Sequence, residues 1–154
     1  MQRLRATQPA ATNTGVGGEA LANMTASNFN TAVGRFALDF NQGNYTTGVG
    51  SYVLFNNNVD NSTAVGAYAL YSNTTATRNT ADGYAALYNN TTAEDNTAVG
   101  YQALATNQTG NENTALGANA LLVNTTGLQN TSTGSFALYS NTEGFNNTAL
   151  VATR

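Results

Sequence analysis

The chain has 154 residues and a mass of 16.0 kDa, the length of one domain or one repeat array. Only 8% of the residues are charged, and a net charge of −3 offers no basic stripe for a nucleic acid. Cysteine, histidine and lysine are absent, which excludes disulfides, thiol nucleophiles and the usual general bases. No apolar run approaches the ~18 residues of a membrane span, and the first residues lack the apolar stretch of a complete secretory signal.

Residues 1–12 are an N-terminal arm whose register can be read against the repeats that follow. Counted back from the first repeat residue, Asn13, Leu4 falls at the position that every repeat fills with leucine. The arm is therefore predicted to be the second half of a coil whose first half is missing.

A phrase of 16 or 17 residues then repeats over residues 13–146. Its consensus is N-T-A-V-G-x-x-A-L-x-x-N-T-T-x-x-x, with glycine always at position five and leucine always at position nine. A fixed period this short predicts a β-solenoid, in which each repeat is one coil that buries its apolar side against its neighbours. The eight full repeats begin at Asn13, Asn30, Thr46, Ser62, Asn79, Asn96, Asn113 and Asn130.

Each repeat predicts a strand, a corner at the glycine, a second short strand and a turn rich in Asn and Thr. The glycine is expected to have positive φ or to lie very close to another backbone. Stacking in register, ~4.8 Å per coil, places valine at position four and leucine at position nine in interior ladders, and asparagine at position twelve in a hydrogen-bonded ladder. The ladder residues predicted from this pattern are Thr97, Val99, Gly100, Leu104, Asn107, Leu87, Leu121 and Leu138.

Asp82 occupies position four, where the neighbouring coils have Val65 and Val99. A carboxylate in a buried apolar ladder is costly unless it is paired or protonated. Two readings are open: pairing with Arg78 or partial exposure, or a ring of three Asp82 side chains that holds a cation on a trimer axis.

Catalysis has little support, because the many hydroxyl groups lack an activating base. Asp95 and Glu112 share one position in adjacent coils, beside Glu94, and are read first as solvated acids at a turn. A glycosidase pair is the alternative, since such enzymes need only two carboxyl groups. We expect no enzyme, no cofactor and no metal site.

Two strong apolar residues per coil make a thin core for a single rod. Aromatic residues at positions seven and ten add apolar surface that side-by-side packing of three rods would cover. The sequence therefore predicts an all-β, parallel β-solenoid or β-roll of about eight 17-residue coils, assembled as a homotrimer. The aromatic residues are Phe36, Tyr52, Tyr68 and Phe136 at position seven, and Phe55, Tyr71, Tyr88 and Tyr139 at position ten.

Residues 147–154 form a partial C-terminal coil that contains Asn147, Thr148 and Leu150 at positions one, two and four. With the half-coil of residues 1–12, it would complete one coil between two molecules and give head-to-tail filaments. Frayed ends, or a longer gene cut at these points, explain the same register.

The phrase NTAVGYQAL, followed by NTTG-like turns, resembles repeats of bacterial and phage fibre proteins. It is also similar to the head repeats of trimeric autotransporter adhesins, which form parallel β-rolls in trimers. The resemblance covers residues 13–151 and implies a structural, adhesive fibre outside the cell, on its surface or on a virion. Its implied partners are further copies of itself and a host-surface glycan or protein. The rival prediction is a monomeric solenoid that binds ice or a glycan, since one threonine recurs in every coil.

Overall fold

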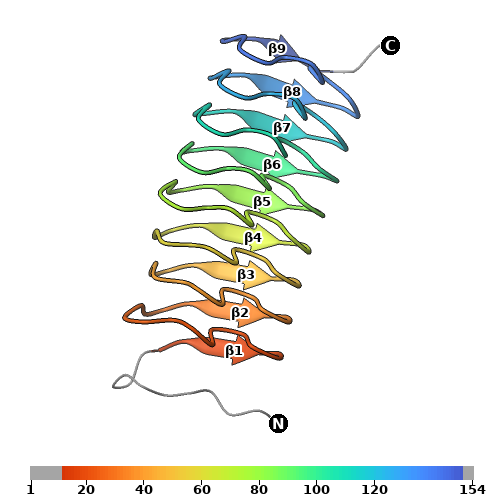
Figure 1. Cartoon of the computed structure of the whole chain (residues 1–154). Helices are drawn as coiled ribbons and strands as arrows, with labels where there is room; N and C mark the ends of the chain where they lie inside the picture. The colour runs from red at the N-terminus through yellow and green to blue at the C-terminus, as the bar shows by residue number, and fades with distance from the viewer. Residues whose placement is uncertain (1–11, 151–154) are drawn as a thin grey trace.

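The computed structural model describes residues 12–150, which form a stack of coils with one short strand in each (Figure 1). All nine strands pair in parallel, in sequence order, within a single sheet. No helix occurs among the described residues, and the expected all-β parallel β-solenoid of about eight turns is confirmed. The strands are β1 (Thr14–Val16), β2 (Thr31–Val33), β3 (Thr47–Val49), β4 (Thr63–Val65), β5 (Thr80–Asp82), β6 (Thr97–Val99), β7 (Thr114–Leu116), β8 (Thr131–Thr133) and β9 (Thr148–Ala149).

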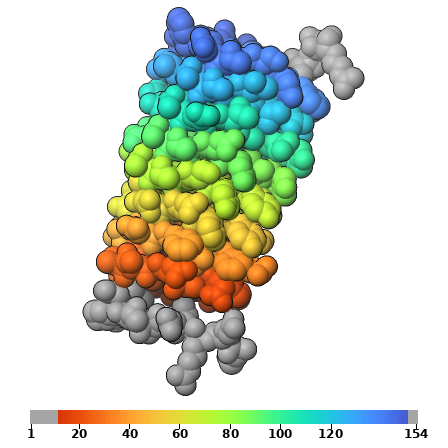
Figure 2. All heavy atoms as spheres, viewed as in Figure 1, coloured from red at the N-terminus to blue at the C-terminus, as the bar shows by residue number. Residues whose placement is uncertain are grey.

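The strands pair in the register that the repeat predicts. Thr97 pairs with Thr80 on one side and with Thr114 on the other, so like residues lie on like residues along the stack. The 16-residue coils keep this register because they are one residue shorter in the turn after position twelve. There the asparagine amide bonds a carbonyl two residues ahead, whereas in the 17-residue coils it bonds one three residues ahead. Figure 2 shows the coils as successive layers packed on one another.

The interior consists of alanine at positions three and eight and leucine at position nine. Ala98, Ala103 and Leu104 are all 0% exposed. The predicted valine ladder of the interior is wrong, because Val99 points outward and is 38% exposed. Successive side chains of a strand point to opposite faces, so an inward position three places positions two and four outside.

The leucine explains why position three is small. Leucine side chains fill the thin interior, and the residue opposite is small; the largest is Ser132, which is 0% exposed and donates its hydroxyl to the carbonyl oxygen of Ala137 at 2.7 Å. The coil that begins at Thr46 shows the limit, since it has Val53 where most coils have alanine and Gly48 where most have alanine. A Cβ atom added to Gly48 would lie 3.0 Å from Cγ1 of Val53 and 3.3 Å from Leu38.

The second strand expected after the glycine does not form. The segment is a run of turns, with positive φ at positions seven and nine, and the eight leucines have φ between 47° and 57°. This left-handed conformation costs a non-glycine residue ~1–2 kcal/mol. Burial of a leucine side chain, worth ~1.5–3 kcal/mol, offsets that cost. The amide of Leu104 also donates to the carbonyl oxygen of Ala120 in the next coil at 3.0 Å.

The glycine corner has both predicted features. Gly100 has φ of +133°, and an added Cβ atom would lie 2.6 Å from the carbonyl carbon and oxygen of Gly117 in the next coil. The other position-five glycines stack in the same way, with φ between 120° and 145°. A side chain at this corner would therefore force neighbouring backbones apart.

The predicted asparagine ladder at position twelve is confirmed. The side-chain amide of Asn107 donates to Oδ1 of Asn90 at 3.2 Å and to the carbonyl of Gly110 at 2.8 Å. Its own Oδ1 accepts from Asn124 at 2.9 Å. A second buried ladder runs along position one, where Oδ1 of Asn96 accepts from the backbone N–H of Asn113 at 2.9 Å.

Candidate functional site

The outward side of the sheet is the first candidate surface, and we call it the strand face. It consists of the side chains at positions two and four of every coil, and Thr97 and Val99 are representative. At ~3.3 Å per residue and ~4.8 Å per strand, it is a strip about 10 Å wide and about 40 Å long. Its apolar members are unusually exposed for their type: Val33 36%, Val49 37%, Val65 40%, Val99 38% and Leu116 39%.

Asp82 is the one charged side chain of the strand face within residues 12–150. It lies in register between Val65 and Val99 and is exposed. The buried ladder expected at position four is therefore wrong, and the interpretation of Asp82 as an exposed carboxylate is confirmed for the single rod. Arg78 does not pair with it. A ring of three Asp82 side chains requires the trimer and stays a prediction.

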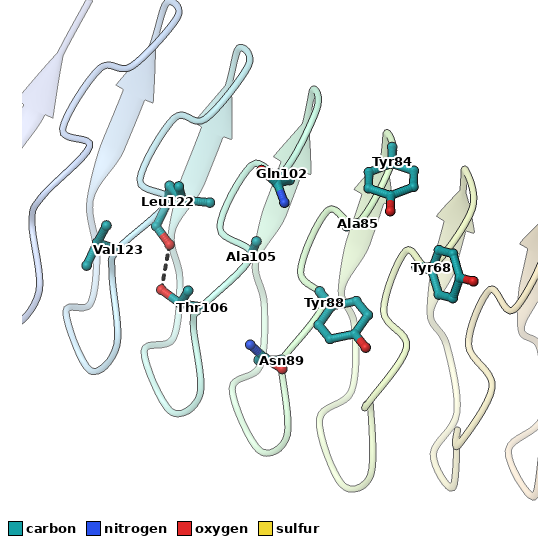
Figure 3. A pocket seen from close by; sticks show the side chains of 10 residues that line it. All are labelled: Tyr68, Tyr84, Ala85, Tyr88, Asn89, Gln102, Ala105, Thr106, Leu122 and Val123. Atoms are coloured by element: carbon teal, nitrogen blue, oxygen red, sulfur yellow. Dashed lines mark hydrogen bonds between the residues drawn. The ribbon is translucent and has the colours of Figure 1, made fainter.

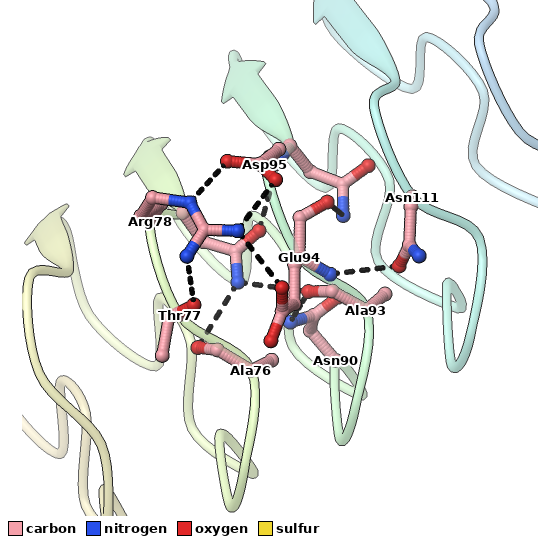
Figure 4. A network of polar contacts seen from close by, with 10 residues as sticks. Ala76, Thr77, Arg78, Asn90, Ala93, Glu94, Asp95 and Asn111 are labelled. Carbon is pink, nitrogen blue, oxygen red and sulfur yellow. Dashed lines mark hydrogen bonds and ion pairs between the residues drawn. The ribbon is translucent and has the colours of Figure 1, made fainter.

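Arg78 instead holds two carboxylates of the next coil (Figure 4). Its Nε atom lies 2.6 Å from Oδ1 of Asp95, and Nη2 lies 2.9 Å from Oε2 of Glu94. The hydrogen bond from Arg78 lowers the pKa of Asp95 below its ordinary value. The general acid of a glycosidase needs a raised pKa, so the lowered pKa of Asp95 does not suit that role. Glu112, the other predicted carboxylate, accepts from Gln129 at 3.1 Å.

Stacked aromatic rings form two ladders on the segment between the glycine corner and the asparagine turn. In each ladder one ring lies on the next from coil to coil, with centroid distances of 4.9–5.4 Å. The position-seven ladder is Phe36, Tyr52 and Tyr68, and the position-ten ladder is Phe55, Tyr71 and Tyr88. The sequence predicted aromatics at both positions. It missed the position-six pair of Tyr84 and Tyr101, whose centroids are 5.4 Å apart, because tyrosine occurs there in only two coils.

A hollow of about 500 Å³ opens where both ladders stop (Figure 3). The next residue of the position-seven ladder is Ala85, and the next of the position-ten ladder is Ala105. The hollow is the space that two further aromatic rings would fill if these ladders continued. The hollow is lined by Tyr68, Tyr84, Ala85, Tyr88, Asn89, Gln102, Ala105, Thr106, Leu122 and Val123. Sequence reasoning did not find this site, although the change from aromatic to alanine at the same repeat position marks it.

The C-terminal residues continue the stack as predicted from their register. The backbone N–H of Asn147 donates to Oδ1 of Asn130 at 3.0 Å, and Thr148 pairs with Thr131. Leu150 is 70% exposed. Leu4 lies outside the described residues, so the head-to-tail joint stays a prediction.

Residues 12–150 contain no group of three or more acidic side chains placed to hold a metal ion. In the same residues, no helix has the length and apolar character needed to span a membrane.

The fold defines a β-solenoid repeat protein with two candidate surfaces, the strand face and the hollow. The sequence matches no protein-family model, and it has no match among curated proteins or solved structures. The resemblance to fibre repeats is therefore carried by the repeat phrase alone, and function has to be argued from the geometry of these surfaces.

Proposed function

We propose that the protein is a structural and adhesive fibre that works outside the cell or on a virion. Its rods associate side by side as a homotrimer through the strand face. The observation that carries the proposal is the row of outward apolar side chains at position four, valine in β1, β2, β3, β4 and β6 and leucine in β7, interrupted by Asp82 in β5. Contiguous apolar patches of more than a few hundred Å² usually mark interaction sites.

The strand face suits association with identical rods. Its side chains pair in register from coil to coil, so two or three parallel rods can bring each position-four side chain against the same residue of the next rod. Asp82 is the one charge that such packing would have to accommodate. Two rods could also cover the face, and the resemblance to trimeric head repeats favours three. A closed ring of three identical faces satisfies every copy equally.

The molecular mass in solution tests the assembly. A homotrimer has three times the mass of the 16.0 kDa chain, that is about 48 kDa, by light scattering or sedimentation. Val49→Asp should give folded monomers, because Val49 is 37% exposed in the single rod but central in the proposed interface. Asn58→Asp adds the same charge to the exposed turn of the same coil and should leave the trimer intact. A monomeric parent chain would refute the proposal.

A second candidate is an ice-binding monomer, favoured by the outward threonine at position two of every coil, the first residue of each strand. Nine threonines in register form one evenly spaced row, beside a second row of position-four side chains. A stable 16.0 kDa monomer that slows ice-crystal growth, and loses this activity in Thr63→Lys, would support it. A trimer with no effect on ice-crystal growth would exclude the ice-binding monomer and support the fibre.

A further inference from the structure

We propose that the hollow beside Tyr88 is a binding site for a neutral glycan, with one sugar ring stacked on the face of Tyr88. The inference rests on the proposed adhesive role and names the chemical class of its ligand. The shape of the hollow, the polar side chains that line it and its lack of charge all favour such a ligand.

The shape of the hollow follows from the ladder that it interrupts. Tyr71 stacks on one face of Tyr88 with an interplanar angle of 5°, and no described ring stacks on the other face. Ala105 occupies the next place in the ladder and Leu122 the place after it, so the tyrosine ring and the leucine are the two walls of a slot. Alanine forms its floor.

The width of the slot selects for a saturated ring. Two coil steps separate Tyr88 from Leu122, or about 9.6 Å. Subtracting ~1.8 Å for the half-thickness of each wall leaves ~6 Å. A flat aromatic ligand, ~3.5 Å thick, would leave part of this gap empty. A pyranose ring with its axial hydrogens is thicker and fills it better. The volume of about 500 Å³ exceeds one sugar and leaves room for its neighbours in a chain.

The chemistry of the walls and rim suits a sugar. The face of an aromatic ring is electron-rich and attracts the polarised C–H groups of a sugar face. The side-chain amides of Asn89 and Gln102 line the hollow and make no hydrogen bond with the other residues that line it (Figure 3). Each amide offers both donors and an acceptor, which matches hydroxyl groups that also do both. The hydroxyl of Thr106 already donates to the carbonyl of Leu122.

Charge narrows the ligand class. None of the residues that line the hollow is charged. An acidic sugar would find no cationic partner there, and burial of an unpaired carboxylate costs free energy. Neutral hexoses and N-acetylhexosamines carry no such cost.

The hollow and the strand face lie on different parts of the coil. The residues of the hollow come from the segment after the glycine corner, and Figure 3 shows their side chains along that segment rather than on the strand arrows. Rods that associate through the strand face can therefore leave the hollow open to a glycan.

The experiment uses the full chain and two panels of oligosaccharides. The neutral panel contains oligomers of glucose, galactose, mannose and N-acetylglucosamine, and the acidic panel contains uronic-acid and sialic-acid oligomers. Binding is screened on an array and measured by titration calorimetry. We expect at least one neutral oligomer to bind and the acidic panel to bind at least tenfold more weakly.

Two variants with opposite effects on the hollow locate the site. Tyr88→Ala removes the stacking wall and should weaken binding at least tenfold. Ala105→Tyr extends the aromatic ladder into the slot and should abolish binding without lowering the thermal midpoint, since the new ring can stack on Tyr88 as Tyr71 does. Ala22→Tyr introduces the same residue at the same repeat position, far along the rod, and should bind like the parent.

Failure of this inference can be told from failure of the fibre proposal. A trimer that binds no neutral oligomer, or that still binds after Ala105→Tyr, overturns the glycan site and leaves the fibre. Preference for acidic sugars also overturns it. If Ala105→Tyr changes the mass of the assembly, the hollow is a contact between rods and not a glycan site. A monomer that binds neutral sugar at the hollow overturns the trimer and keeps the site.

Discussion

Replacing one asparagine of the position-twelve ladder should destabilise the rod strongly, although the side chain is polar. Asn107→Ala removes a side chain that is 0% exposed and makes three hydrogen bonds. The change leaves Oδ1 of Asn90 and the carbonyl oxygen of Gly110 without this donor. Asn124 loses one acceptor but keeps its bond to Gly127 at 2.9 Å.

The size of the effect follows from the two acceptors left in the dry interior. A buried polar group without its partner costs ~1–3 kcal/mol, so two cost ~2–6 kcal/mol. With a urea dependence of ~2 kcal/mol per molar, the unfolding midpoint should fall by ~1–3 M. The matched control is Asn58→Ala, an exposed asparagine at position thirteen, which should shift the stability by less than ~0.5 kcal/mol.

Urea unfolding followed by circular dichroism compares the two variants directly. If Asn107→Ala and Asn58→Ala have midpoints that agree within error, water replaces the lost partner at no cost. The ladder would then be a by-product of the repeat and not a source of stability.

The other expected outcomes concern the corner, the interior and one buried acid. Gly100→Ala should cost at least ~3 kcal/mol in urea unfolding, because its Cβ atom meets the next backbone at positive φ, and a normal midpoint would contradict the corner geometry. Leu87→Ala should cost ~2–5 kcal/mol, and Val99→Ala much less in a monomer, so equal losses in thermal melts would reverse the inside and outside of the coil. Burial raises the pKa of Asp39, against the opposing hydrogen bond from Asn23, so the folded chain holds this proton more tightly than the unfolded chain. Burial of the ionised Asp39 carboxylate therefore lowers the free energy of unfolding, fully at pH values above the folded pKa and not at all below the ordinary pKa. Asp39→Asn should stabilise the chain at pH 7. A urea midpoint at pH 7 equal to or lower than that of the parent chain would count against this reasoning.

The register of the stack could be predicted because one glycine and one leucine mark every repeat. Each position has a strict structural requirement. Only glycine fits the corner at Gly100, and a leucine side chain such as that of Leu104 fills the interior. Their spacing fixes the coil boundaries even where a coil is one residue short. The position of each strand follows directly.

The direction of the strand side chains could not be predicted from hydrophobicity alone. Valine at position four is more apolar than alanine at position three, which favours valine inside. The structure reverses this, because leucine fills the interior and only a small residue fits beside it: Ala98 is 0% exposed and Val99 is 38% exposed. The restriction of position three to glycine, alanine and serine was the available signal. A small residue there fits beside the interior leucine, since a Cβ atom added to Gly48 would lie 3.3 Å from Leu38.

The second segment of the coil was mispredicted for a similar reason. The apolar and aromatic residues 52–55 favour a strand, but Tyr52 and Leu54 have φ of 56° and 47°. Their conformation is imposed by the neighbouring coils and not by their own preferences. The hollow follows from this segment and from two alanines, so a pattern that averages over all repeats hides it.

Because the register is uniform, coils can be added or removed without changing the contacts between neighbouring coils. Deletion of residues 96–112 would bring the coil that begins at Asn79 directly beneath the coil that begins at Asn113, and threonine, glycine, leucine and asparagine would meet their own kind at the new junction. The reach of the rod would change by ~4.8 Å, with no new type of contact. Unequal exchange between the repeats of such a gene could therefore lengthen or shorten the protein one coil at a time. The rod length would then change in steps of one coil, ~4.8 Å, and selection could act on the number of coils.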